Sequence, residues 1–176
     1  MSRLLTRRQR YAEKFISHKQ LPVSIAAINF QFSDNLAFLI RTVACFGASN
    51  LFVIGHVPDR SELNSKSGTL YDFVNIISFR NTSEFLEYCR SDDLNIVSME
   101  LTDNSISAYD YSFDYSKESV IVLGNEYVGV PADILHNSDV IHIPMNGVGY
   151  CLNTSQCGTA ILSEYSRRYA DRGHSL

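Results

Sequence analysis

Short apolar runs alternate with polar or glycine-containing segments along the whole chain. Runs of four to eight residues that are rich in β-branched side chains and closed by turn residues predict buried strands. By this criterion the predicted strands are residues 23–28, 51–54, 74–79, 95–101, 120–123 and 140–145.

Between the predicted strands, apolar residues recur at helical spacing. One such stripe consists of Leu36, Leu39, Ile40 and Val43. It predicts an amphipathic helix over residues 35–46 that is capped by Ser33 or Asp34 and ends at Gly47. The final long helix is predicted to begin at Asn153 and to end in Arg167 and Arg168, and a shorter helix is predicted over residues 82–90 with Phe85, Leu86 and Cys89 inward.

This order of elements predicts the fold class. Apolar strands that alternate with helices are typical of an α/β protein with a mostly parallel sheet and helices on both faces. A chain of 176 residues is large enough for one domain of this kind, so residues 1–176 are predicted to form a single domain. Ligands of such sheets bind beyond the carboxyl ends of the strands, where the loops after residues 123 and 145 are predicted to converge.

Three further segments carry separate predictions. Thr6 is placed to cap a basic helix at about residues 3–20, whose stripe of Tyr11, Phe15 and Ile16 is expected to dock on the domain. The polar segment 58–72 is interpreted as a mobile loop that approaches the substrate, although its spacing is not that of a P-loop. The aromatic segment 105–117 either stacks on nucleic-acid bases or, as we favour, covers a core or a subunit interface.

Composition narrows the class of protein. No apolar run approaches the roughly 18 residues of a membrane span, and the basic N-terminus lacks the apolar region of a signal peptide. The four cysteines show no C-x-x-C pairing and are predicted to be buried thiols in a reducing cytoplasm. No metal site is expected, because no His, Cys or acidic cluster has metal-ligand spacing.

The net charge is -4, but the charged residues are unevenly distributed along the chain. Only one acid, Glu13, lies in residues 1–20, and the basic residues there are Arg3, Arg7, Arg8, Arg10, Lys14 and Lys19. Arg167, Arg168 and Arg172 add positive charge near the other end. Because a local basic patch attracts phosphates whatever the total charge, RNA is a possible partner, and the N-terminal cluster is the better candidate surface.

The last third of the chain resembles a known family. Residues 123–130 read Leu-Gly-Asn-Glu-Tyr-Val-Gly-Val, and this segment is similar to the second motif of the SpoU (TrmH-type) RNA 2′-O-ribose methyltransferases. Ile-Pro-Met at residues 143–145, followed by Leu-Asn-Thr-Ser at residues 152–155, resembles their third motif. Asn35, six residues before Arg41, resembles the first. The resemblance extends from about residue 25 to residue 168.

The resemblance implies both a fold and an activity. Its members tie the C-terminal part of the sheet into a deep trefoil knot, an exception to the rule that chains do not thread loops. They transfer a methyl group from S-adenosyl-L-methionine to a ribose 2′-hydroxyl of RNA, and they work as homodimers. The resemblance therefore implies an RNA methyltransferase of the cytoplasm, with tRNA favoured over rRNA because the chain lacks a long accessory RNA-binding domain.

The resemblance also implies roles for individual residues. The expected catalytic group consists of Arg41, Asn35, Asn153, Glu126 and Cys151. Arg41 is expected to bind the phosphate beside the target ribose, because a guanidinium is normally always protonated and is therefore a poor free-standing base. Asn35 and Asn153 would orient these groups, and Glu126 would position Arg41 by a charge-assisted bond. The cofactor is expected to lie against Gly124, Ile143 and Leu152, with Met145 and Asn125 nearby.

Some residues depart from the family pattern. Cys151 stands where Ser is usual, Phe32 stands where Asn is usual, and Ala37 stands where Gly is common. These departures keep two alternatives open. The chain could be a silent or weakened RNA-binding member of the family, or a base methyltransferase of the same superfamily. An unrelated nucleotide-binding α/β protein is the least favoured interpretation.

Overall fold

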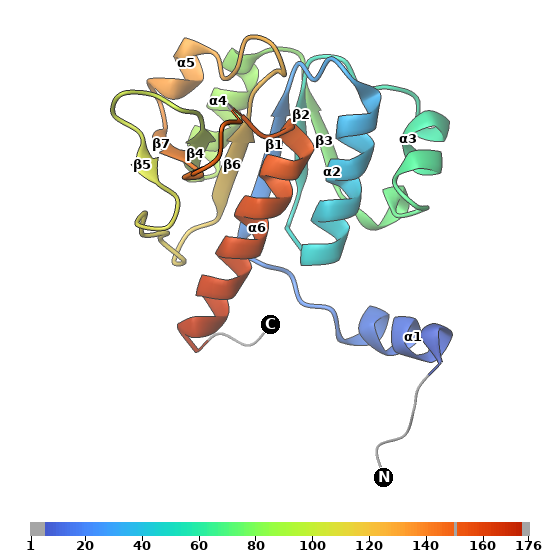
Figure 1. Ribbon diagram of the computed structural model, residues 1–176. Coiled ribbons are helices and arrows are strands. Elements are labelled where there is room, and N and C mark those ends of the chain that lie inside the picture. Colours follow the sequence, from blue (N-terminus) through green and yellow to red (C-terminus); the bar gives the residue numbers. More distant parts are fainter. Residues whose placement is uncertain (1–5, 150, 174–176) are drawn as a thin grey trace.

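A single parallel sheet runs through the computed structural model, which describes residues 6–149 and 151–173 (Figure 1). Within these residues the sheet has seven strands in the order β3-β2-β1-β6-β4-β7-β5, and every pairing is parallel. The strands are β1 (Val23–Ile28), β2 (Leu51–Ile54), β3 (Ile76–Phe79), β4 (Asn95–Met99), β5 (Ile106–Ser107), β6 (Ser119–Leu123) and β7 (Asp139–His142). The predicted fold class is confirmed.

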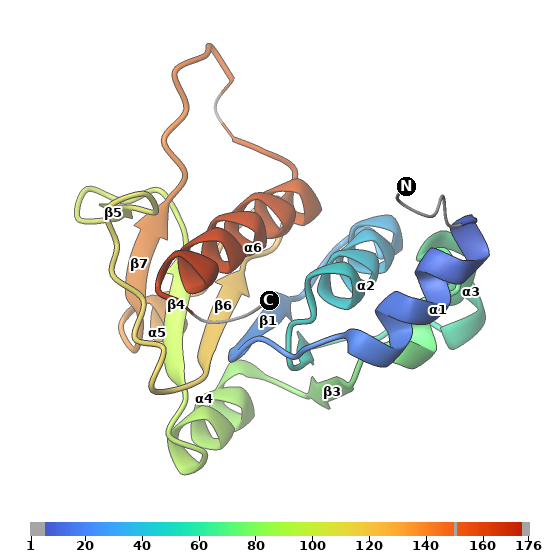
Figure 2. The ribbon, with the colours of Figure 1, turned by 90° about the horizontal axis from the view of Figure 1, so that it is seen from below.

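Helices cover both faces of this sheet (Figure 2). The helices of the described residues are α1 (Arg7–Ser17), which lies apart from the sheet in Figure 1, α2 (Ser33–Phe46), α3 (Arg60–Lys66), α4 (Thr82–Ser91), α5 (Ala132–Leu135) and α6 (Thr154–Asp171), with a 3-10 turn at η1 (Tyr71–Phe73). Helices α2 and α6 lie side by side on one face, whereas α4 and α5 lie on the other. In the residues described, no helix is long and apolar enough to cross a membrane.

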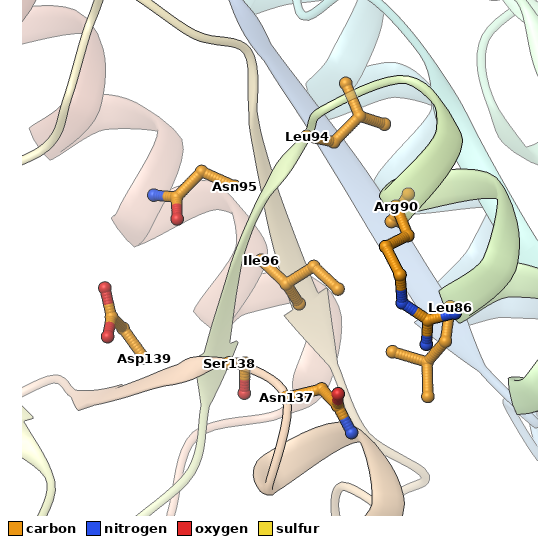
Figure 3. A pocket seen from close by; sticks show the side chains of 9 residues that line it. Leu86, Arg90, Leu94, Asn95, Ile96, Asn137, Ser138 and Asp139 are labelled. Atoms are coloured by element: carbon orange, nitrogen blue, oxygen red, sulfur yellow. The ribbon is translucent and has the colours of Figure 1, made fainter.

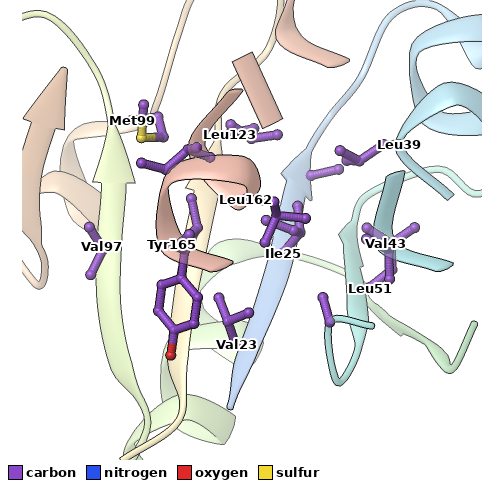
Figure 4. Close-up of a cluster of buried hydrophobic side chains, with 14 of the residues drawn as sticks. Val23, Ile25, Leu39, Val43, Leu51, Val97, Met99, Leu123, Leu162 and Tyr165 are labelled. Atoms are coloured by element: carbon purple, nitrogen blue, oxygen red, sulfur yellow. The ribbon is translucent and has the colours of Figure 1, made fainter. Parts of the chain in front are cut away.

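The alternation of side chains along the strands builds two apolar cores. Ile25 on β1 and Ile121 on β6 face α2 and α6, and this core includes the fully buried Tyr165 of α6 (Figure 4). Ile28 and Val122 belong to the opposite core, under α4 and α5. Successive residues of a strand point to opposite faces, so a strand buried on both faces must be apolar throughout.

Several predicted boundaries need correction. β3 begins at Ile76 rather than at residue 74, β4 ends at Met99 rather than at residue 101, and β7 ends at His142 rather than at residue 145. Helix α6 continues to Asp171, beyond the predicted end at Arg168. Apolar residues just outside a strand extend a hydrophobic run without adding ladder hydrogen bonds, and this explains the overlong predictions.

The predicted capping of α2 is wrong. The helix begins at Ser33, and its N-cap residue, Phe32, makes no side-chain capping bond. The side chains of Ser33 and Asp34 instead accept hydrogen bonds from Lys66 of α3. The other end agrees with the prediction, because Gly47 adopts a φ of 70° there and its N–H bonds to the Val43 carbonyl.

Residues 58–72 are largely helical, contrary to the prediction of a mobile loop. They contain α3 and the start of η1, and α3 buries Leu63 against the α2 side of the sheet. One buried residue in a seven-residue helix leaves almost no periodic signal, so the sequence pattern could not reveal it.

The aromatic segment 105–117 covers the core, as favoured above. Tyr111 and Phe113 are buried, and the Phe113 ring lies edge-on to Tyr165 of α6 at 4.9 Å between centroids. Tyr109, by contrast, is 55% exposed. Stacking of Tyr111 or Phe113 on a nucleic-acid base is therefore excluded in this conformation.

The N-terminal helix forms, but it spans Arg7–Ser17 and ends before the predicted residue 20, and the predicted residues 3–5 lie outside the described part of the chain. Thr6 is its N-cap, and a reciprocal capping box joins Thr6 and Gln9. The stripe of Tyr11, Phe15 and Ile16, on which docking was predicted, lies outside the side chains that the structure describes. The prediction of buried cysteines holds for Cys89 but is wrong for Cys45 and Cys151, which are exposed.

Candidate active site

The carboxyl ends of the central strands meet at one edge of the sheet, the upper edge in Figure 1. Met99 at the end of β4 pairs with Leu123 of β6 and with Ile141 of β7, so the loops that follow these strands start side by side. The loop 124–131 carries the second motif, and the segment 143–153 carries the third. Ligands of parallel α/β sheets bind at this edge.

The second-motif loop is closed by its own hydrogen bonds. The backbones of Asn125 and Gly129 bond to each other in both directions, at 3.1 and 3.0 Å. The Asn125 Oδ1 accepts from the N–H groups of Tyr127 and Val128, and its Nδ2 donates to the Asn29 carbonyl at 2.6 Å. Asn125 therefore shapes the loop and ties it to the end of β1.

Gly124 is required by the loop itself. A Cβ on Gly124 would lie 2.2 Å from the carbonyl carbon of Gly129 and 2.4 Å from the nitrogen of Val130. Contacts of this kind with backbone atoms cannot be relieved by a side-chain rotation. Gly124 was predicted to lie against the cofactor, and the packing of the loop is a second reason for a glycine at this position.

A chain of hydrogen bonds joins all three motifs. The Glu126 carboxylate accepts from Asn35 Nδ2 at 2.6 Å, and Asn35 Oδ1 accepts from Asn153 Nδ2 at 2.9 Å. The Asn153 Oδ1 in turn accepts from the N–H and the hydroxyl of Ser155, at 2.9 and 2.7 Å. Asn35, Asn153 and Glu126 were predicted as site residues and lie together; Ser155 was not predicted to take part in this chain.

The predicted bond between Glu126 and Arg41 is not found within the described part of the chain. The Glu126 carboxylate also accepts from the backbone N–H groups of Gln31 and Phe32, at 2.8 and 3.4 Å. Burial raises the pKa of Glu126, but the hydrogen bonds from Gln31 and Asn35 outweigh it, so that the pKa is lowered overall. Glu126 thus fixes the turn before α2 instead of positioning Arg41.

Arg41 is exposed on α2 and lies close to Gly68. A Cβ on Gly68 would be 3.4 Å from Arg41 Nη1, so the guanidinium lies against the turn that follows α3. Gly68 and Thr69 both have positive φ, of 72° and 65°. A glycine at position 68, which has no Cβ, therefore leaves room for the Arg41 guanidinium.

The third-motif segment leaves the body of the protein between β7 and α6 (Figure 2). Ile143 is partly buried, Met145 and Leu152 are 41% and 40% exposed, and Cys151 is exposed. These apolar side chains fit an adenosine moiety, and a carboxylate, Glu100, lies against the end of the second-motif loop and fits a cationic group. The residues present therefore fit S-adenosyl-L-methionine.

Glu100 was missed because the predicted strand ran to residue 101 and placed it inside the sheet. It follows Met99, the last residue of β4, and its side chain is partly buried. The Glu100 Oε2 accepts from the Val130 N–H at 3.0 Å, at the end of the second-motif loop.

A separate cavity of about 410 Å³ lies at the opposite edge of the sheet (Figure 3). Its lining includes Asn95 and Asp139, the first residues of β4 and β7, together with Arg90 of α4. None of the predicted site residues lines it. Across residues 6–149 and 151–173, no group of three or more His, Cys, Asp and Glu side chains could hold a metal ion.

Comparison with known families agrees with this geometry. The model of the SpoU rRNA Methylase family matches residues 22–163, which include the three motif segments and the strands that carry them. The chain belongs to this family. Its hydrogen-bonded triad of Glu126, Asn35 and Asn153 lies within the matched residues.

Two curated relatives are tRNA (guanosine(18)-2′-O)-methyltransferases. The one from Mus musculus is 29% identical over 139 residues, a region that covers 76% of this chain and 9% of the relative. The one from Aquifex aeolicus is 26% identical over 173 residues, which cover 97% of this chain and 81% of the relative. This chain thus spans a small part of the first and most of the second.

Solved structures share the fold. The A. aeolicus TrmH/SpoU tRNA modifying enzyme superposes with a TM-score of 0.79 at 24% identity, over 94% of this chain and 84% of that one. An AdoMet-bound rRNA methyltransferase from Sinorhizobium meliloti gives 0.77 at 24% identity, over 86% of this chain and 57% of that one. Likeness at this level of identity supports the architecture.

Proposed function

We propose that this protein is an S-adenosyl-L-methionine-dependent RNA methyltransferase that acts on a ribose 2′-hydroxyl, with tRNA as the favoured substrate. The observation that carries the proposal is the bonded chain Glu126–Asn35–Asn153, which joins the three motifs at the ligand-binding edge of the sheet. The names of the two tRNA methyltransferase relatives support tRNA, and an rRNA (uridine(2479)-2′-O)-methyltransferase from Streptomyces viridochromogenes, 29% identical over 140 residues, keeps rRNA as the second choice.

The bound cofactor supplies an already activated methyl group. The protein then has to hold the acceptor hydroxyl in line and to help remove its proton. Arg41 is the proposed residue for this task, since its exposed guanidinium is free to bind the phosphate beside the target ribose and to polarise the hydroxyl. The proton passes to an oxygen of that phosphate.

Asn35 and Asn153 keep the α2 and α6 segments in register around this ribose. Asn35 is buried, its Nδ2 donates to Glu126 and its Oδ1 accepts from Asn153. Its proposed role is therefore to position residues rather than to contact the substrate. Gly124, Asn125, Ile143, Met145 and Leu152 are proposed to hold the cofactor with backbone groups and apolar side chains.

The basic helix α1 is proposed to contact RNA phosphates. Arg8, Arg10 and Lys14 of this helix are exposed. At the other end of the chain, Arg167 is paired with Glu164 and Asp171, and Arg168 bonds to Glu164 and to the Tyr111 carbonyl. The C-terminal arginines are thus partly neutralised, and this favours the N-terminal cluster as the RNA contact.

Three further features complete the proposal. The single SpoU-type domain is proposed to contain the trefoil knot, to work as a homodimer and to act in the cytoplasm. Phe38 on the outer side of α2 is 49% exposed and supplies apolar surface for a second copy. Light scattering at micromolar concentration tests the dimer, and a monomer there would count against it.

A silent RNA-binding protein is the second candidate. Phe32 is 49% exposed, and its ring lies 6.1 Å from that of Tyr127, so two exposed aromatic rings lie close together where the first and second motifs meet. The deciding experiment incubates the protein with labelled cofactor and unmodified tRNA or rRNA, followed by nucleoside analysis. A 2′-O-methylated nucleoside supports the proposal, a methylated base supports the related base methyltransferase, and RNA binding without transfer supports the silent protein.

A further inference from the structure

Glu100 occupies a central position that no motif assigns. It directly follows β4, and β4 lies in the sheet between β6 and β7, the two strands that lead into the second and third motifs. Its backbone N–H bonds to the Ile141 carbonyl of β7 at 3.0 Å. The backbone of Glu100 therefore lies between the ends of the two strands that lead into the motif loops.

Its carboxylate lies against the second-motif loop. Oε2 accepts from the Val130 N–H at 3.0 Å, and Oε1 accepts from the Leu101 N–H at 3.1 Å. A Cβ on Gly129 would lie only 2.4 Å from Glu100 Oε2. The close contact with Gly129 shows that the loop is folded around this carboxylate.

On its other side, Glu100 acts on the first turns of α6. Burial is the main cause that raises the pKa of the Cys157 thiol to about 11, and the charge of Glu100 is the second. The carboxylate therefore contacts the second-motif loop, and its charge acts on a residue in the first turn of the third-motif helix. The residues proposed to contact the cofactor belong to the second-motif loop and to the segment that leads into this helix.

The charge of Glu100 has no cationic partner in the described residues. The ion pairs formed by residues 6–149 and 151–173 all involve other side chains. Two backbone N–H groups orient the carboxylate but do not neutralise it. A partly buried, unpaired charge is costly, so this position favours a bound cation.

We infer that Glu100 makes the site prefer the cationic donor S-adenosylmethionine over its neutral product S-adenosylhomocysteine. The inference rests on the proposed function. The two ligands have nearly the same shape and differ by the methyl group and by one unit of positive charge at the sulfur. A negative charge in the site therefore acts on their relative affinity and helps the product to leave after transfer.

The test measures both dissociation constants by calorimetry for the wild type and for Glu100→Gln. The glutamine keeps an acceptor for the Val130 N–H and removes the charge. We expect the preference for the donor to fall by about tenfold, because a unit charge within roughly 10 Å acts with this strength at an effective dielectric constant near 20. Glu87→Gln, on the exposed side of α4, removes the same charge elsewhere and is expected to leave the preference unchanged.

An unchanged preference in Glu100→Gln overturns the inference. Equal weakening of both ligands also overturns it, because Glu100 would then only shape the loop. If the wild type binds neither ligand, the proposed function itself fails, and that result cannot be confused with an unchanged ratio. Should Glu100→Gln not fold, Glu100→Asp and Glu100→Asn form a second pair of equal size, in which only the aspartate is expected to keep the preference.

Discussion

The side chain of Asn153 donates from Nδ2 to Oδ1 of Asn35 at 2.9 Å, across 118 residues of sequence. Asn153 caps α6 with its other amide atom, and Asn35 lies in the first turn of α2. The bond therefore fixes the start of one helix against the start of the other. Since Glu126 also bonds to Asn35, a single amide holds three motif segments in place.

Replacing this amide is expected to destabilise the fold. In Asn35→Ala, the Glu126 carboxylate and the Asn153 amide both lose a partner in a partly buried place, and this should lower the free energy of unfolding by about 1–3 kcal/mol. Urea denaturation measures the effect. Asn75→Ala serves as the control, because it removes an exposed amide bond to Asn50 of 2.7 Å. Equal losses in the two variants would contradict the structural role of Asn35.

The second-motif loop gives a matched pair of glycine substitutions. Gly124→Ala places a Cβ 2.2 Å from a backbone carbon of Gly129, whereas a Cβ at Gly147 meets nothing within 4 Å. We expect Gly124→Ala to cost about 1–3 kcal/mol of stability by overpacking and to weaken cofactor binding at least tenfold by moving the loop. Gly147→Ala should change neither quantity. Urea denaturation measures the loss of stability, and calorimetry with S-adenosylmethionine measures the loss of binding. Normal binding by Gly124→Ala would show that cofactor binding does not need this loop geometry.

The ion pairs of α6 are expected to make the free energy of unfolding depend on pH in the acid range. Hydrogen bonding by Arg167 is the largest cause that lowers the pKa of Glu164 to about 2, opposed by partial burial and helped by Arg168. A carboxyl group whose pKa is lowered by folding stabilises the protein fully above its ordinary value of 4.5, and this stabilisation is lost as the pH falls through about 2. Because the pairs are partly exposed to water, we estimate their contribution at about 1 kcal/mol.

The measurement compares urea denaturation of the wild type with that of Glu164→Gln at neutral pH and at about pH 2.5. The gap in stability between the two proteins should shrink as the pH falls. Glu87→Gln, on the solvent side of α4, should show no gap at either pH. A gap that stays constant with pH would mean that Glu164 stabilises α6 by packing rather than by charge.

Periodicity was sufficient to predict six of the seven strands in the described residues and the helices α2, α4 and α6, but not β5, which lies in the segment 105–117, where no strand was predicted. Ile25, Leu36 and Ile121 were placed in the core because regular strands and helices bury residues at fixed intervals. The same reasoning failed for α3, which buries only one residue. It also failed for the start of α2, because the side chains of Ser33 and Asp34, which were predicted to cap the helix, accept hydrogen bonds from Lys66 instead. These features depend on contacts with distant segments, and a local pattern contains no information on them.

In the candidate site, too, some residues were placed correctly from the sequence and others were not. The resemblance brought Asn35, Glu126 and Asn153 together correctly, because motif loops at the ends of neighbouring parallel strands must meet. It misjudged the partner of Glu126, since spacing along the chain does not tell which amide or guanidinium a carboxylate will reach. Glu100 was overlooked because an apolar run continued past the end of β4 and concealed the boundary.

Arg41 gives the most direct test of the proposed chemistry. It is exposed, and its guanidinium lies beside Gly68. Arg41→Ala should therefore lower the rate of methyl transfer by roughly 100-fold or more, through lost positioning and charge stabilisation at the target ribose. Affinity for S-adenosylmethionine should stay within about twofold of the wild type, because in the described residues no hydrogen bond or ion pair joins the guanidinium to the motif loops.

Two further variants separate chemistry from surface charge. Arg80→Ala removes an exposed arginine that is paired with Glu84, and it should leave transfer unchanged. Arg41→Lys keeps the positive charge but lacks the planar fork that binds a phosphate through two parallel bonds, so only partial activity is expected. Full activity of Arg41→Ala on an RNA that the wild type methylates would remove Arg41 from the mechanism. Another group at this edge of the sheet would then have to bind the phosphate and polarise the hydroxyl.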